Sequence, residues 1–272
     1  MNKFLICSFL FSQWALPTHY AVFNDSYDLA ANRKIAQGDH QKLNWYRLEY
    51  KKLAYDNYKE CGLPKNDYCT QPIKYFWREI PVLKGKNEIN IKDFPRIFSP
   101  GTHRLHAAAN FPKIDPKPEN AIEIVIRRDN SYVGFVSELL GLPFVFWPRK
   151  TGLGYHQTDH RLGADCVATL IYGQRRIGHK VPYVAPQGLF KYIQPIMPIG
   201  DSQPIKLGDI LHFGHQTAVI SQDKEPIGYL NGTDMVIHAY PNVIREDQIK
   251  DLPYRFLAYR VYRWKIELNV ID

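Results

Sequence analysis

One cysteine in this chain occupies a position where a thiol can become reactive. Cys166 follows Asp165 and opens the small and apolar run Val167–Gly173, which is typical of the first turns of a buried helix. The helix dipole and the free N–H groups of a first turn favour the thiolate form of a cysteine placed there. Cys166 is therefore a candidate nucleophile, although a free cysteine is also a common small residue of protein cores.

Two histidines later in the chain could supply the other groups that thiol chemistry needs. His215 lies just before the strand-like run Thr217–Ile220, and His238 lies within the strand-like run Met235–Tyr240. In thiol catalysis an imidazole takes the proton of the thiol, and a third polar group fixes the tautomer of that imidazole. We therefore take Cys166, His215 and His238 as the candidate catalytic residues.

The amino terminus has the features of an export signal. The short basic start Met1–Lys3 precedes the apolar run Phe4–Phe11, which is too short to span a bilayer. Ala21 offers a small residue for cleavage. We expect residues 1–21 to be a signal peptide and the mature chain to be periplasmic or extracellular, without stable membrane insertion. The alternative is an apolar N-terminal strand of the fold.

The cysteine count then singles out Cys166. The chain has four cysteines, and removal of residues 1–21 takes away Cys7 and leaves three. Cys61 and Cys69 flank a turn-rich segment that could close as a disulfide in an oxidising compartment. Cys166 would then be the odd thiol, which in an exported protein is either an intermolecular partner or a reactive group.

Composition limits the classes of partner. The 272 residues carry a formal net charge of +8, but the basic residues are dispersed in short pairs and form no stripe. This pattern argues against nucleic-acid binding and suits an anionic cell-wall polymer. His103 and His106 lack the cysteines or carboxylates that would complete a metal site. We expect no metal or organic cofactor, since thiol chemistry needs none.

The elements that would position these residues divide the chain near residue 130. Residues 22–129 are expected to form a smaller accessory region, with a helix around 40–59 and β-strands over 73–77, 89–91 and 121–126. Residues 130–272 begin with helical segments and continue with strand-like runs at 210–213, 217–220, 235–240 and 259–266. This order predicts an α+β fold in which the nucleophile helix packs on an antiparallel sheet.

Five motifs in order resemble those of NlpC/P60-type cysteine peptidases. They are Leu140–Phe144, the pair Asp165-Cys166, Leu207–Leu211, the strand beside His215, and Val236–Ala239. The resemblance covers roughly residues 130–240 and implies a papain-like fold. It also implies an exported hydrolase that cuts amide bonds in peptidoglycan stem peptides. By position, Cys166 matches the nucleophile, His215 the general base and His238 the residue that orients the base.

The chain departs from the family pattern in ways that leave the base open. Val167-Ala168 replaces the Ser-Gly that usually follows the nucleophile, and Phe144 replaces a common tyrosine. The family has a small residue two positions after the catalytic histidine, and counting back from Ala218 gives Gln216. A shift of one residue along a strand reverses the face of its side chain.

Three assignments of the base therefore remain: His215 brought inward by a bulge, His212, or no functional base. His156, Asp159 and His160, in the loop before Cys166, could line a substrate cleft. The alternatives to a hydrolase are an inactive papain-like domain that binds cell-wall peptide, a secreted effector or toxin, and a structural protein with an incidental thiol.

Overall fold

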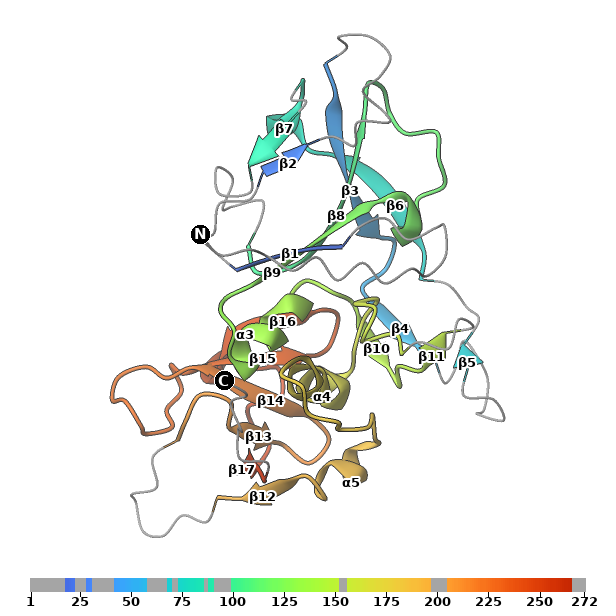
Figure 1. Ribbon diagram of the computed structural model, residues 1–272. Helices are drawn as coiled ribbons and strands as arrows, with labels where there is room; N and C mark the ends of the chain where they lie inside the picture. Colours follow the sequence, from blue (N-terminus) through green and yellow to red (C-terminus); the bar gives the residue numbers. More distant parts are fainter. Residues whose placement is uncertain are drawn as a thin grey trace.

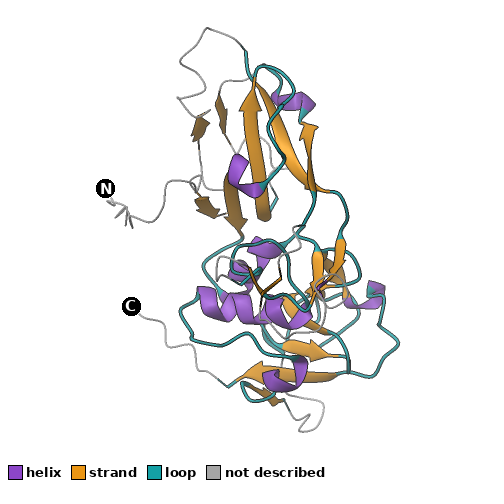
Figure 2. Cartoon of the chain, turned by 90° about the vertical axis from the view of Figure 1, so that its right-hand side faces the viewer, coloured by secondary structure: helices purple, strands orange, loops and turns teal. Residues whose placement is uncertain are grey.

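A computed structural model of the chain describes two β-sheets that lie toward opposite ends of the molecule, with helices between them (Figures 1 and 2). The described residues are 18–22, 28–30, 42–57, 68–69, 73–85, 88–90, 99–151, 156–196 and 205–265. Within them, no helix is long and apolar enough to cross a membrane.

The first sheet belongs to the N-terminal part of the chain. Its five strands lie in the order β1 (Thr18–Val22), β9 (Ile122–Arg127), β8 (Gly101–Ala108), β3 (Asn44–Tyr50) and β6 (Tyr75–Glu79). β1 runs parallel to β9, and the other neighbours are antiparallel. A short antiparallel pair, β2 (Asp28–Ala30) with β7 (Glu88–Asn90), accompanies this sheet.

The helix expected around 40–59 is wrong, because β3 and β4 (Ala54–Asp56) occupy this segment. Trp45 faces one apolar cluster together with Leu105 and Ile124, whereas Tyr46 and Leu48 face a second cluster. A strand buried on both faces loses the alternation of apolar and polar residues that identifies a strand in a sequence. This is why the spacing of the aromatic residues was misleading.

The second sheet has six strands and is antiparallel throughout. Its order is β12 (Ile193–Pro195), β17 (Arg260–Trp264), β13 (Ile210–His212), β14 (Thr217–Gln222), β15 (Met235–Ala239) and β16 (Ile244–Gln248). Helices α3 (Tyr132–Val136) and α4 (Cys166–Arg176) pack on one face of it. The expected mixture of helices and an antiparallel sheet is confirmed at the level of an α+β fold.

The two faces of this sheet have separate cores. Val219, Ile237 and Ala239 pack with α3 and α4 on one face. Leu211, Ala218 and Val236 pack on the other face with the segment that follows the 3₁₀ turn η6 (Ile249–Asp251). Because side chains alternate along a strand, the face of each candidate residue follows from its position in β13, β14 or β15.

Short parallel pairs cross the predicted boundary near residue 130. β4 pairs with β10 (Phe144–Phe146), and β5 (Tyr68–Cys69) pairs with β11 (Lys150–Thr151). The remaining elements are the short helix α5 (Pro186–Leu189) and the 3₁₀ turns η1 (Pro81–Leu83), η3 (Pro118–Asn120) and η4 (Ser137–Leu139). Segments from both predicted regions therefore build the area around residues 144–151.

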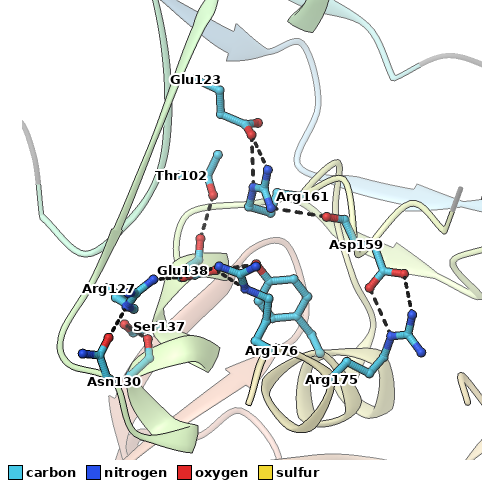
Figure 3. Close-up of polar contacts among 12 residues, drawn as sticks. Thr102, Glu123, Arg127, Asn130, Ser137, Glu138, Asp159, Arg161, Arg175 and Arg176 are labelled. Atoms are coloured by element: carbon cyan, nitrogen blue, oxygen red, sulfur yellow. Dashed lines mark hydrogen bonds and ion pairs between the residues drawn. The ribbon is translucent and has the colours of Figure 1, made fainter. Parts of the chain in front are cut away.

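Buried ion pairs join the two sheets. Glu138 is fully buried and accepts hydrogen bonds from Arg127, which ends β9, and from Arg176 and Tyr172 of α4 (Figure 3). Its backbone carbonyl accepts a hydrogen bond from the Thr102 hydroxyl at 2.7 Å. A second carboxylate, Glu123, pairs with Arg104 and Arg161. These contacts couple α4, and with it Cys166, to the first sheet.

Only part of the predicted export signal and of the predicted disulfide lies within the described residues. Residues 1–17 and Cys61 lie outside the described residues, and only the backbone of Cys69 is described. Ala21 lies within β1, opposite Ile126 of β9, so cleavage after Ala21 would remove most of this edge strand. Export and the Cys61–Cys69 disulfide both stay predictions.

Candidate active site

Cys166 is the first residue of α4, as the sequence predicts. The Asp165 carboxylate caps the helix by accepting a hydrogen bond from the Ala168 N–H at 2.7 Å. A carboxylate at this position satisfies a donor of the first turn that has no partner in the helix. Gly163, two residues earlier, has φ +149°, and a Cβ there would lie 2.4 Å from Val145. The chain can therefore approach β10 closely just before the helix begins.

The sulfur of Cys166 is held as a thiol by its surroundings. Its side chain is only 7% exposed, and burial raises the pKa of the thiol to about 11, with a smaller contribution from the negative charge of Asp165. The hydroxyl and N–H of Thr217 and the N–H of Val167 oppose this increase in the pKa. Desolvation thus outweighs the helix N-terminus, and the expected thiolate is not the form at neutral pH.

His215 does not lie in a strand. It is exposed in the turn between β13 and β14, where its N–H donates to the Phe213 carbonyl at 2.9 Å. No hydrogen bond or ring contact joins it to Cys166 among the described residues. The one irregularity in the pairing of β14 with β15 falls between Ile220 and Gln222, at the end of β14 far from His215. A bulge that would bring His215 inward is therefore not found in the described pairing.

Thr217 is the residue of β14 that contacts Cys166. As the first residue of the strand it shares a face with Val219, which packs against α4. His212 pairs directly with Thr217 across the β13–β14 ladder and therefore lies on this same face. The His212 ring packs against Phe190 at 5.1 Å and Tyr262 at 6.0 Å. Burial lowers its pKa below the ordinary value, with a contribution from His215.

His238 lies on the other face of the sheet. It pairs with Ala218, which belongs to the core on the face away from α4. Its Nε2 lies 2.9 Å from a carboxylate oxygen of Asp247 on β16. An Nε2–H that donates to this carboxylate leaves Nδ1 as the unprotonated nitrogen. His238 therefore has Asp247, and not His215, as its partner.

Burial favours the neutral form of His238. Its side chain is 1% exposed, and burial lowers its pKa below the ordinary value, with a smaller contribution from Arg245. The hydrogen bond to Asp247 and the charge of that carboxylate act in the opposite direction. Nδ1 is buried and has no hydrogen-bond partner within the described residues.

Tyr254 lies with His238 on the face of the sheet away from α4. Its ring centre lies 5.7 Å from that of His238, and burial raises its pKa, with a smaller contribution from the charge of Cys166. Tyr254 follows Leu252-Pro253 in an irregular segment, so no strand or helix period points to it. Only the packing of this segment beneath the sheet places it beside His238.

Several buried polar atoms of the second sheet and of the segment after η6 have no hydrogen-bond partner in the described part of the chain. They are His212 Nδ1, Gln216 Oε1, His238 Nδ1 and the Tyr254 hydroxyl. Buried polar side chains are nearly always paired, so unpaired ones call for a physical explanation. His238 and Tyr254 lie on the face away from α4, whereas His212 lies on the face that carries Cys166, where a donor from a ligand would satisfy its Nδ1.

The loop before Cys166 is structural. The His156 ring stacks on Tyr183 with centres 3.6 Å apart, its Nε2 donates to the Pro148 carbonyl, and its Nδ1 accepts from the Thr158 N–H. Asp159 binds Arg175 and the Tyr183 hydroxyl (Figure 3). These partners explain the polar residues of the loop without a substrate, so the expectation that His156 and Asp159 line a cleft finds no support.

The buried His156 predicts an acid-sensitive fold. Burial lowers its pKa to about 4, so the unfolded chain takes up a proton near pH 6.5 while the folded chain does not. The stabilisation by neutral His156 is complete above pH 6.5 and is lost as the pH falls towards 4, by about 2 to 3 kcal/mol. Urea unfolding of wild type and His156→Asn across this range should give a shallower pH dependence for the variant. Equal slopes would contradict the prediction.

His103 and His106, the two histidines considered as metal ligands, both have contacts within the protein. His103 Nε2 hydrogen-bonds to the Ser99 carbonyl, and the His106 ring packs on Trp77. Within the described ranges, no three His, Cys, Asp or Glu side chains form a group that could hold a metal ion.

No model of a protein family, no curated protein and no solved structure matches this chain.

Proposed function

We propose that this protein is a cysteine hydrolase of the papain-like NlpC/P60 type, exported from the cell, that cleaves an amide bond in peptidoglycan stem peptides. The observation that carries the proposal is a cysteine at a capped helix N-terminus that lies on the same face of the sheet as His212, whose Nδ1 is buried and unpaired within the described residues. An unpaired buried group costs about 1–3 kcal/mol in the free protein. A hydrogen bond from a substrate N–H, a water or the thiol would recover this free energy.

In this proposal Cys166 is the nucleophile and His212 is the base. The His212 imidazole takes the thiol proton, directly or through one water, and the sulfur attacks the substrate carbonyl carbon. The tetrahedral intermediate collapses when the C–N bond breaks, and the proton on His212 passes to the leaving amine. His212 then takes a proton from the water that attacks the thioester, and returns it to the sulfur when the C–S bond breaks. Thr217 pairs with His212 across the β13–β14 ladder and hydrogen-bonds to the sulfur, so the histidine and the thiol share one face of the sheet.

His212 is preferred to His215 and His238 as the base because of its position. His212 lies opposite Thr217 on the face of the sheet that carries α4, and its Nδ1 is buried without a partner within the described residues. His215 is exposed in a turn, and His238 lies on the other face with Asp247 as its partner. A thiol with a raised pKa and an imidazole with a lowered pKa fit general-base catalysis better than a resting thiolate–imidazolium pair.

Substitution of each histidine tests this choice. His212→Gln is expected to lower kcat by roughly 10²- to 10⁴-fold, the usual contribution of a general base. His215→Gln serves as the matched control and is expected to change kcat by less than about threefold, since an exposed turn residue is not engaged in proton transfer. A larger loss in His215→Gln than in His212→Gln would restore His215 as the base.

The pH profile gives an independent check of the base. Because the pKa of His212 is lowered below its ordinary value, this base stays neutral at pH 6.5 and is lost only as the pH falls further. The acid limb of kcat should therefore lie below pH 6.5 in wild type. The acid limb should disappear from the residual activity of His212→Gln.

Digestion of purified peptidoglycan tests the proposed activity. The wild-type protein should release soluble fragments, and mass spectrometry should find new free amino termini within the stem peptides. Cleavage of glycan bonds alone, with intact stem peptides, would exclude the proposed bond. Release of nothing over a range of pH and salt concentrations would exclude hydrolysis of this substrate.

A second function, a catalytically inactive domain that binds cell-wall peptide, is favoured by two observations. Gln216 stands where the family resemblance places the base, and the pKa of Cys166 is raised to about 11. A binder would sediment with insoluble peptidoglycan without releasing fragments, and Cys166→Ala would bind as well as wild type. The net charge of +8 predicts that sedimentation with an anionic wall weakens as salt is added.

A further inference from the structure

Arg149 is a buried arginine without a carboxylate partner among the described residues. It lies between β10 and β11 (Figure 1) and is 6% exposed, and its Nε and Nη2 are buried without a hydrogen-bond partner there. Arg104 and Arg245 also have an unpaired nitrogen, but each forms an ion pair with a carboxylate. Burial of a charged group is costly unless the group is paired, so the position of Arg149 calls for an anion.

The two unpaired nitrogens of Arg149 form the edge of a guanidinium group that binds a carboxylate. Nε and Nη2 together take both oxygens of a carboxylate in a bidentate pair. Arg175 binds the two oxygens of Asp159 in this way, each at 3.2 Å. Arg263 binds those of Asp209, each at 2.7 Å. Arg149 has the same edge without an acceptor in the described part of the chain, so a planar carboxylate is the anion that fits.

Buried amide groups fix the backbone around Arg149. The N–H of Arg149 donates to Gln157 Oε1 at 2.9 Å, and the Gln157 N–H donates to the Arg149 carbonyl at 2.8 Å. Asn57 Nδ2 donates to Gln157 Oε1 at 2.6 Å and to the Trp147 carbonyl at 3.1 Å. The backbone that carries the guanidinium is thus held in place before an anion binds, which lowers the entropy lost on binding.

The segment that carries Arg149 runs beside the residues that lead into α4. The Val145 N–H donates to the Ala164 carbonyl at 3.0 Å. Two residues later, the Trp147 N–H donates to the Asp165 carboxylate, which caps α4. Arg149 follows after two more residues, at most about 7 Å of extended chain. A peptide of a few residues whose amide lies at the start of α4 can therefore reach Arg149.

Trp147 gives a second, independent indication of binding in this segment. Its φ of +60° is a left-handed conformation that a bulky residue rarely adopts, and such strain clusters at active sites and ligand clamps. It is 44% exposed, and its ring contacts the exposed ring of Phe146, with centres 6.3 Å apart. Two exposed rings thus lie in the chain just before Arg149, where they can contact the apolar part of a ligand.

We propose that the Nε and Nη2 edge of Arg149 binds a carboxylate of the substrate peptide and so positions the amide bond that Cys166 attacks. Every linear peptide has a terminal carboxylate, and acidic residues add others. Both nitrogens are closed to water in the free protein, so the carboxylate enters by a local opening and is then desolvated. A charge-assisted bidentate pair is strong in such surroundings. The positioning of the amide rests on the proposed hydrolase function, whereas the binding of a carboxylate does not.

Binding of a carboxylate to the full chain is tested with sodium acetate as the probe. Acetate is expected to raise the melting temperature of wild type, relative to sodium chloride at the same ionic strength, by more than it raises that of Arg149→Met. The difference between the two proteins removes the general effect of each salt on stability. Equal shifts in wild type and Arg149→Met would overturn the proposal. A larger difference in sodium phosphate than in acetate would assign the site to phosphate and would also overturn it.

The stability of the free variants separates a binding role from a structural one. Arg149→Met removes a buried charge that has no partner in the described residues, so its melting temperature in sodium chloride should equal or exceed that of wild type. Arg263→Met is the matched control, because it leaves the buried carboxylate of Asp209 unpaired and should lower the melting temperature. A similar fall in both variants would assign Arg149 a structural role and overturn the proposal.

Kinetics with a peptide substrate tests the positioning role. Arg149→Met is expected to raise KM by roughly 10- to 100-fold, the usual effect of losing a hydrogen bond to a charged group. Arg149→Lys should recover only part of this loss, because an ammonium group lacks the planar fork. Amidation of the carboxylate that is bound should raise KM for wild type and leave KM for Arg149→Met unchanged. Equal KM values for wild type and Arg149→Met would overturn the proposal.

The two measurements distinguish failure of this inference from failure of the hydrolase proposal. Hydrolysis that depends on Cys166 but not on Arg149 overturns only the role of Arg149. Stabilisation by acetate that depends on Arg149, in a protein that hydrolyses no peptide, overturns the hydrolase proposal and leaves Arg149 as a carboxylate-binding residue.

Discussion

The Cys166→Ala variant is expected to hydrolyse stem peptides at least about 10⁴-fold more slowly than wild type, because no other group can form the covalent intermediate. The fold should survive this change. Alanine is the best helix former and the Asp165 cap does not involve the sulfur, so α4 should begin at the same residue. Release of soluble peptide fragments from peptidoglycan, followed by mass spectrometry, measures the loss.

Cys166→Ser is the matched variant, since it keeps a polar atom of similar size at the start of α4. A serine hydroxyl beside a base adapted to a thiol is expected to restore little activity, whereas binding of peptidoglycan should be retained in both variants. Equal fragment release by wild type and Cys166→Ala would rule out thiol catalysis. Alkylation gives a separate check on the sulfur, because a thiol with a pKa of about 11 should react increasingly fast up to that pH.

Replacement of Glu138 by alanine is expected to destabilise the protein by about 3 to 5 kcal/mol, the usual result of breaking a buried ion pair. Glu138 is fully buried and accepts hydrogen bonds from Arg127, Arg176 and Tyr172. Its removal leaves two guanidinium groups and a phenol without their acceptor. Equilibrium unfolding in urea measures the change in the free energy of unfolding.

The control for Glu138 is an ion pair at the surface. Arg78 pairs with Glu49 at 3.2 Å, and its side chain is 69% exposed. Arg78→Ala is expected to change the free energy of unfolding by less than about 1 kcal/mol, because solvent screens such a pair. Similar losses in the two variants would show that the Glu138 network contributes no more than a surface contact. Because Glu138 links both sheets, its loss should also separate the unfolding of the two parts of the chain.

Local chemistry in the sequence was enough to locate the helix that Cys166 opens and four of the six strands of the second sheet, but not β12 or β16. Asp165 caps α4 by accepting a hydrogen bond from Ala168, three residues later, so the local sequence is enough to predict the contact. The runs at 210–213, 217–220, 235–240 and 259–266 are bounded by turns and rich in β-branched and aromatic residues, and they became β13, β14, β15 and β17. The α+β class followed from their order.

Where both faces of a strand are buried, the sequence is less informative about secondary structure. β3 places Trp45 in one core and Leu48 in another, so its apolar residues do not alternate, and a helix was predicted in its place. The pairing of β4 with β10 and of β5 with β11 joins residues far apart in the chain. No local pattern contains such contacts, because they depend on how the two sheets are placed against each other.

The sequence by itself determined that a cysteine opens a capped helix and that histidines follow it on or beside antiparallel strands. The tertiary structure decided what those residues can do. Register places His238 on the face away from α4 with Asp247, leaves His215 exposed in a turn, and sets His212 opposite Thr217 on the face that carries Cys166. Burial raises the pKa of Cys166, so the thiol form is favoured where the sequence had predicted a thiolate. The face of a side chain and the dielectric around it depend on contacts distant in the sequence, so only the assembled fold could decide them.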